Sequence, residues 1–207
     1  MFKSLFKVLT LSSLLAIGSL GFIAPSNAAN VQIAYEATQG QTSVPYGWVD
    51  FCARYDGECA NNALAPQAIH FSADNFKEIA RINHFVNKAI DPVSDWDHWH
   101  KVDQWDIPTD GKGDCEDYAL LKRQILMREG FPRQALLMTV VRDQQNEGHA
   151  ILTVHTDRGD YVLDNLSNGV KLWTSTGYRF VKRQSQSNPN VWESIGAPAT
   201  ELATAAN

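Results

Sequence analysis

The chain has 207 residues and an acidic balance, with 23 aspartates and glutamates against 18 lysines and arginines and a formal net charge of −5. The first 28 residues hold two lysines and no acids, so their removal moves the net charge to −7. This balance excludes a basic face of the kind that binds nucleic acid or an anionic membrane surface. The 179 residues from position 29 onward suit one compact domain.

The N-terminal segment has the features of a secretory signal peptide. Two lysines precede an apolar run from Val8 to Ile23, and small residues fit a cleavage site before Ala29. A retained membrane anchor is the alternative, but the run is short for a membrane span. We therefore expect residues 1–28 to direct the chain to the periplasm, residues 29–197 to form the domain and residues 198–207 to be a flexible tail.

Three cysteines follow the signal segment, and an odd count in an oxidising compartment leaves one unpaired. Six residues separate Cys52 from Cys59, which is long enough to turn and short enough to pair. The sequence predicts that these two form a disulfide and that Cys115 is the free thiol. A bridge that includes Cys115 is the alternative.

Apolar residues recur at helical spacing from Ser72 to Ile90, with Ser72 or Asp74 as the candidate cap and Pro92 beyond the end. This pattern predicts a scaffold helix. Residues 91–106 have no clear period and are predicted to form a loop near the site. Zinc binding by His98 and His100 is disfavoured, because their spacing matches none of the usual closed ligand sets.

The tryptophans of residues 91–106 alternate with acids and histidines. They either pin the loop to the domain or form a binding surface for a peptide or partner, since tryptophan is enriched at interfaces.

Gly111 to Tyr118 is a glycine-punctuated loop that runs into an amphipathic helical pattern, which Gly130 and Pro132 end. Cys115 falls in the first turn. Unpaired backbone N–H groups and the positive end of the helix dipole favour a thiolate there. The alternative is a small buried apolar residue without chemistry.

Three carboxylates flank this cysteine, and anions raise the pKa of a neighbouring thiol unless something offsets them. Helix capping accounts for part of the set, because Asp114 is a good N-cap and Asp117 can close a short capping box. A bound calcium ion accounts for more, because its ligands are hard carboxylate oxygens. The candidate ligands are Asp114, Glu116 and Asp117, with Asp103 of the preceding loop as a further one.

After the Cys115 helix the pattern becomes strand-like. The segments are 135–141, 149–156 and 161–163, with shorter candidates at 169–173 and 178–181. Turn residues between them predict antiparallel hairpins. The order predicts an α+β domain whose nucleophile helix packs on an antiparallel sheet.

The hairpin that turns at residues 157–159 brings His149 and Asp164 to the same end of two strands. An imidazole held by a carboxylate and facing a helix-borne thiol is a nucleophile–base–orienter arrangement. We expect His149 to move the thiol proton and Asp164 to fix the tautomer. By alternation His155 lies on the same strand face as His149, so periodicity alone leaves it as a rival.

Four stretches resemble the bacterial transglutaminase-like cysteine proteinases, a family that includes LapG-type periplasmic proteases of large surface adhesins. They are Gly-Asp-Cys-Glu-Asp-Tyr-Ala-Leu-Leu-Lys-Arg at 113–123, Gly-His-Ala-Ile-Leu-Thr-Val at 148–154, Leu-Asp-Asn at 163–165 and Val-Lys-Arg-Gln-Ser at 181–185. The resemblance implies a papain-like, transglutaminase-core fold with Cys115, His149 and Asp164 as a triad that works through a thioester.

The same resemblance implies calcium at Asp114 and Glu116, with Asp117 as a further candidate. It also implies that a tryptophan ahead of the cysteine, of which Trp105 is the nearest match, engages an inner-membrane receptor controlled by a cyclic dinucleotide. The substrate carries over less directly than the triad, because nothing in the chain itself points to an adhesin.

Three other functions are compatible with the pattern. The triad can pass its acyl group to an amine, which makes a protein crosslinker, or it can hydrolyse peptidoglycan amides. A non-enzymatic calcium-dependent binding module is the third, and it predicts a buried, unreactive Cys115. We rank proteolysis by a calcium-dependent endopeptidase first.

Overall fold

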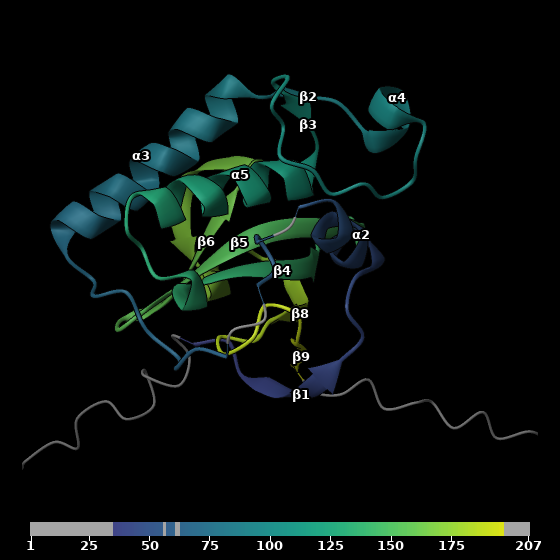
Figure 1. The fold of residues 1–207 in the computed structure, drawn as a ribbon. Coiled ribbons are helices and arrows are strands. Elements are labelled where there is room, and N and C mark those ends of the chain that lie inside the picture. The colour runs from purple at the N-terminus through teal and green to yellow at the C-terminus, as the bar shows by residue number, and fades with distance from the viewer. Residues whose placement is uncertain (1–34, 56, 61–62, 197–207) are drawn as a thin grey trace, which may run out of the picture.

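The computed structural model describes residues 35–55, 57–60 and 63–196 (Figure 1). The predicted signal peptide, 1–28, and the predicted tail, 198–207, lie outside these residues. Within them, no helix combines the length and the apolar character that a membrane crossing requires.

A seven-stranded, wholly antiparallel sheet forms the body of the domain. In spatial order its strands are β1 (Thr38–Thr42), β9 (Trp192–Ile195), β8 (Arg179–Gln184), β4 (Leu136–Arg142), β5 (Gly148–Thr156), β6 (Gly159–Asp164) and β7 (Ser167–Leu172). The five predicted strands are therefore confirmed. β1 and β9 were not predicted, because both are short and their burial does not give a clear alternation.

The helices lie mainly against one face of this sheet. They are α2 (Tyr46–Arg54), α3 (Ala73–Ala89), α4 (Asp95–Trp99) and α5 (Cys115–Arg128), with short 3₁₀ segments at Arg133–Ala135 and Trp173–Ser175. Figure 1 shows α3 beside α5, and α5 packs chiefly on β5. The predicted α+β class, with the nucleophile helix on an antiparallel sheet, is confirmed.

The scaffold helix α3 forms as its sequence predicts. The Ser72 hydroxyl accepts a hydrogen bond from the Asn75 backbone N–H at 3.1 Å and so caps the first turn. Its apolar stripe, which includes Ile79, Ile82 and Val86, is buried in the same core as the inner face of α5.

Residues 91–106 are more ordered than a loop. A two-residue strand β2 (Asp91–Pro92) pairs in parallel with β3 (Lys112–Gly113), which leads into α5. The loop prediction is wrong at Asp95–Trp99, because Ser94 caps a short helix there and accepts a hydrogen bond from the Asp97 backbone N–H at 3.2 Å. This segment is thereby fixed beside the start of α5.

Cys52 and Cys59 form the expected disulfide, with a Cα–Cα distance of 5.5 Å, and Cys115 is the free cysteine among the described residues. Such a bond fits an oxidising compartment. It closes the C-terminal end of α2. Asn190 ties this end to the turn before β9, because it accepts from the Trp48 indole at 3.1 Å and donates to the Cys59 carbonyl at 3.0 Å.

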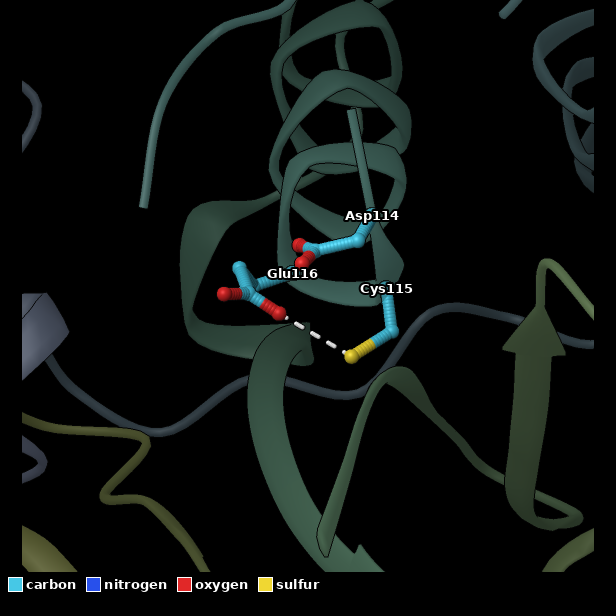
Figure 2. A group of neighbouring side chains, drawn as sticks. All are labelled: Asp114, Cys115 and Glu116. Carbon is cyan, nitrogen blue, oxygen red and sulfur yellow. Dashed lines mark hydrogen bonds between the residues drawn. The ribbon is translucent and has the colours of Figure 1, made fainter. Parts of the chain in front are cut away.

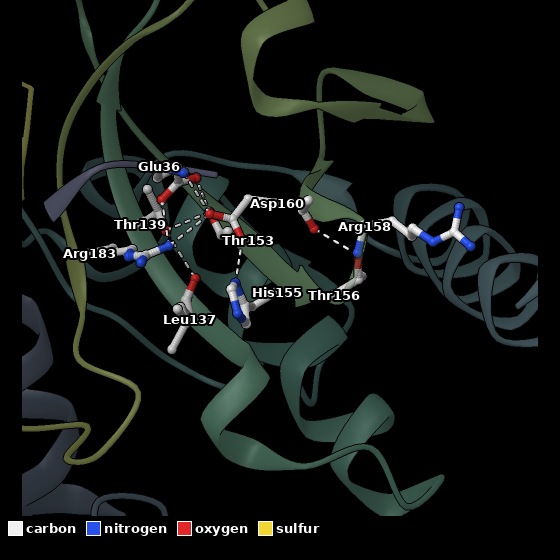
Figure 3. A network of polar contacts seen from close by, with 10 residues as sticks. Glu36, Leu137, Thr139, Thr153, His155, Thr156, Arg158, Asp160 and Arg183 are labelled. Carbon is white, nitrogen blue, oxygen red and sulfur yellow. Dashed lines mark hydrogen bonds and ion pairs between the residues drawn. The ribbon is translucent and has the colours of Figure 1, made fainter. Parts of the chain in front are cut away.

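A buried polar network connects the residues just before β1 to the sheet (Figure 3). The Arg183 guanidinium contacts Glu36 and Asp160, each at 3.1 Å, and Thr153 donates to Glu36 at 3.0 Å. His155 pairs with Asp160 at 2.6 Å. The rival histidine is therefore engaged at the opposite end of β5 from His149.

Candidate active site

Cys115 is the first residue of α5, and its surroundings are built by the acids around it. The predicted capping box is present, with the Asp114 backbone N–H donating to the Asp117 carboxylate at 3.3 Å. Glycine is required at position 113, because a Cβ atom there would lie only 2.7 Å from the Asp117 Cβ. The loop can therefore close tightly over the helix start.

The Cys115 thiol is partly buried and donates a hydrogen bond to Glu116 Oε2 at 3.0 Å (Figure 2). On its other side it accepts from the Ala150 backbone N–H at 3.4 Å. Burial and the Glu116 carboxylate raise the pKa of this thiol well above its ordinary value. These surroundings therefore favour the protonated thiol.

His149 and Asp164 are joined by a hydrogen bond of 2.9 Å between Nε2 and Oδ1, and both side chains are buried. The register of β5 and β6 explains the contact. Leu152 of β5 pairs with Leu163 of β6, so the next residue of β6, Asp164, lies opposite position 151 of β5. Position 151 is two residues from His149 and on the same face of the strand.

The Asp164 carboxylate has two further donors. Tyr178 donates its hydroxyl at 2.6 Å, and the Leu166 backbone N–H donates at 3.0 Å. Burial raises the pKa of Asp164, but the hydrogen bonds from His149, Tyr178 and Leu166 outweigh it and hold the pKa below its ordinary value. Tyr178 was not predicted as a site residue, because only the three-dimensional turn of the chain brings it to Asp164.

One cavity of about 350 Å³ contains both Cys115 and His149. Its walls also include Tyr46 of α2, Trp105 and Asp103 of the segment before α5, and Lys182 of β8. We call it the catalytic cavity. It brings a helix-borne thiol and a carboxylate-held imidazole to one concave surface, which is the arrangement that acyl transfer requires.

Five acids gather at the start of α5. The carboxylates of Asp95, Asp103 and Glu116 form one group with ligand atoms within 4.8 Å of one another, and those of Asp95, Asp114 and Asp117 form another. Asp95 was not among the predicted ligands, because it lies 19 residues before Asp114 in a segment without periodicity. The structure brings together all four predicted acids and adds this one.

Burial and mutual repulsion disfavour the charged forms of these acids. Burial and the neighbouring carboxylates raise the pKa of Asp95 to about 6 and that of Asp117 to about 8. Those of Asp114 and Glu116 are raised as well, with burial as the largest cause. Among the described residues, Asp114 Oδ1 is buried without a hydrogen-bond partner. A hard divalent cation fits this donor set of carboxylate oxygens.

Trp105, the residue predicted to engage a receptor, is buried in the core with 3% of its surface exposed. Its ring meets those of Trp48 and Trp192 edge to face, and its indole N–H donates to Asp103 at 2.9 Å. Glycine at position 47 makes room, because a Cβ atom there would lie 2.8 Å from the Trp105 Cγ. In this structure Trp105 is a wall of the catalytic cavity, whereas the exposed tryptophans of the segment are Trp96 and Trp99.

His98 and His100 are not brought together as ligands. His98 pairs with Asp110 at 2.8 Å, and His100 bonds to the Trp96 carbonyl at 2.9 Å.

Among solved structures, the chain is similar to calcium-bound LapG of Legionella pneumophila at 22% identity. That alignment covers 61% of this chain and 74% of the LapG chain with a TM-score of 0.50. The EGTA-treated form of the same protein matches with 22% identity, coverage of 61% and 73%, and a TM-score of 0.49. At 22% identity, the similarity to the calcium-bound form shows a shared fold.

No curated protein matches the chain. The family model of the bacterial transglutaminase-like cysteine proteinases, however, matches residues 38–200, which include nearly all of the described domain. The chain therefore belongs to the bacterial transglutaminase-like cysteine proteinases and is a cysteine protease.

Proposed function

We propose that the chain is a periplasmic, calcium-dependent endopeptidase in which Cys115, His149 and Asp164 form the catalytic triad. The observation that carries the proposal is the catalytic cavity, which Cys115 and His149 share while Asp164 bonds to the far side of the imidazole at 2.9 Å. Residues 29–197 are the catalytic domain in this proposal.

The hydrogen bond between His149 Nε2 and Asp164 leaves Nδ1 as the ring nitrogen that takes the Cys115 proton. The thiolate then attacks the carbonyl carbon of the scissile bond, and the carbonyl electron pair moves onto oxygen. Backbone N–H groups at the start of α5 stabilise that oxyanion. When the C–N bond breaks, Nδ1–H protonates the leaving amine and the acyl group stays on Sγ as a thioester.

Hydrolysis of the thioester completes the cycle. His149 Nδ1 takes a proton from water, the resulting hydroxide attacks the acyl carbon, and the C–S bond breaks. The proton returns to Sγ. Asp164 keeps its charge throughout, because its donors hold the ionised form and stabilise the imidazolium that forms beside it.

In the proposed calcium site, the carboxylates that would hold the ion are those of Asp114, Glu116, Asp117, Asp103 and Asp95. A bound cation would offset the carboxylates that raise the thiol pKa, and Glu116 would then hold the Cys115 proton less strongly. LapG of Legionella pneumophila, a protein of similar fold, is known in a calcium-bound and an EGTA-treated form, which supports calcium as the cation.

The proposed substrate is a large secreted or outer-membrane adhesin, reached through the signal peptide at residues 1–28. Family membership and the Cys52–Cys59 disulfide support this placement. An inner-membrane receptor controlled by a cyclic dinucleotide is part of the proposal as well. Burial of Trp105 leaves its docking residues unassigned.

The test is to incubate the pure protein with secreted and outer-membrane proteins from its own source and to map new termini by mass spectrometry. We expect cleavage of one large protein with calcium, and none after chelation or with Cys115→Ala. Equal cleavage by Cys115→Ala would contradict the proposal. Crosslinked products in place of new termini would assign the acyl group to an amine acceptor.

A further inference from the structure

An apolar patch lies beside the catalytic cavity and has no role in the chemistry described above. Among the described residues, eight large hydrophobic side chains are exposed, and three of them belong to this patch: Tyr46 at 75%, Val49 at 52% and Val102 at 90%. Tyr46 and Val49 are three residues apart on α2 and share one helix face. Large exposed apolar groups next to a reactive centre mark binding surfaces.

A second cavity, of about 440 Å³, opens between Tyr46 and Val102. Asp50, Lys101 and Asp103 complete its walls. Tyr46 and Asp103 also line the catalytic cavity, so the two cavities share a wall. We call the second one the Tyr46–Val102 cavity. The shared wall makes this cavity the neighbour of the one that holds Cys115.

The two acids of this cavity are already engaged, and Lys101 is its one basic wall residue. Asp50 pairs with Arg54 at 2.9 Å, and Arg54 also donates to the Trp105 carbonyl at 2.5 Å. Asp103 accepts from the Trp105 indole at 2.9 Å. A cationic ligand would have to compete with these partners, whereas the Tyr46 ring and the Val102 methyl groups are open. An apolar occupant therefore fits better than a cationic one.

We infer that the Tyr46–Val102 cavity is a substrate subsite that selects an apolar side chain at one fixed position near the scissile bond. The inference rests on the proposed protease function and adds the substrate class of this subsite. An extended peptide advances about 3.3 Å per residue. Adjacent cavities therefore place the selected position within about four residues of the bond that Cys115 attacks.

The experiment uses the calcium-loaded protein and a library of peptides made by digesting a bacterial proteome, with cleavage sites read by mass spectrometry. For the wild type we expect aliphatic or aromatic residues to be enriched about fivefold or more at one position on one side of the cleavage site. Tyr46→Ala and Val102→Ser should reduce that enrichment to less than about twofold, because each removes part of the apolar wall.

Phe85→Ser is the matched control, since Phe85 is an exposed apolar residue of α3 outside both cavities. It should leave the enrichment unchanged. The rate at which iodoacetamide alkylates Cys115 should stay within twofold of wild type in Val102→Ser, which shows that the catalytic cavity is intact.

Two outcomes count against the inference in different ways. Cleavage with no apolar preference, or a preference that survives both cavity variants, overturns the subsite and leaves the protease function standing. Library cleavage that persists in Cys115→Ala overturns the protease function together with the subsite. A patch that binds a partner protein instead of substrate would give the first of these results.

Discussion

Asp164 bonds to His149 at 2.9 Å across the ends of β5 and β6, and it is the carboxylate that faces this imidazole. The contact engages Nε2 and leaves Nδ1 for the thiol proton in the proposed mechanism. Asp164→Asn keeps the shape but can hold the ring in the wrong tautomer. We expect kcat to fall by about 10⁴-fold, as for the equivalent change in serine proteases. The rate of peptide-bond cleavage measures this loss, and a fall of less than tenfold would contradict the orienting role.

Tyr178 donates to the other oxygen of Asp164 at 2.6 Å, so it stabilises the carboxylate that holds His149. Tyr178→Phe removes one of three donors and leaves the ring. Because a hydrogen bond to a charged group contributes about 1.5–3 kcal/mol, we expect a loss of about tenfold in kcat with little change in KM. Tyr161→Phe is the control, since that tyrosine lies in the ring cluster of Phe71 and Phe76 away from the site. Equal effects of the two changes would argue against Tyr178.

Asp95 is the acid that joins both carboxylate groups at the start of α5. Asp95→Asn should weaken calcium binding by about tenfold or more, because it removes a charge that both groups share. Titration calorimetry measures the affinity. Asp97→Asn is the control on the same short helix, since Asp97 bonds to Ser94 and belongs to neither group. Calcium binding unchanged by Asp95→Asn would leave Asp95 with only its hydrogen bond to the Gln104 backbone.

Lys122 is fully buried in α5, and its ammonium has no hydrogen-bond partner among the described residues. Burial lowers the pKa of Lys122 to about 7. Between pH 7 and 9 the unfolded chain therefore binds more protons than the folded one, so this group makes the protein more stable as pH rises. The expected gain is about 2 kcal/mol.

Lys122→Met should remove that part of the pH dependence. It should also raise stability at pH 7, because it replaces a buried ammonium group by an apolar side chain of similar size. Urea unfolding of both proteins at pH 7 and pH 9 provides the comparison. Groups common to both proteins cancel in the difference. Parallel pH profiles for the two proteins would show that folding does not lower the pKa of Lys122.

The parts of this structure that the sequence predicted are those with local signals. The Cys115 helix has apolar periodicity and a glycine–proline stop, and the strands have turn residues between them. His149 and Asp164 could be paired because a short hairpin fixes the register between them. The motif resemblance then distinguished His149 from His155, which alternation could not do.

The parts that were missed depend on contacts between distant segments. Asp95 joins the acids through the short parallel pair β2–β3, and such a pairing has no sequence period. Trp105 was predicted to face a partner, yet it fills the space above Gly47, because burial of a tryptophan depends on what packs against it. Tyr178 reaches Asp164 only after the chain has returned past β7.

Iodoacetamide alkylation of Cys115 is the measurement that tests the central claim most directly, because Cys52 and Cys59 are bonded to each other and this thiol alone reports. With calcium at pH 7, Cys115 should react at least about tenfold faster than the same thiol in the urea-unfolded protein. Chelation or His149→Ala should remove that advantage. A folded-state rate no faster than the unfolded one, unchanged by His149→Ala, would contradict the account and favour a binding module without catalysis.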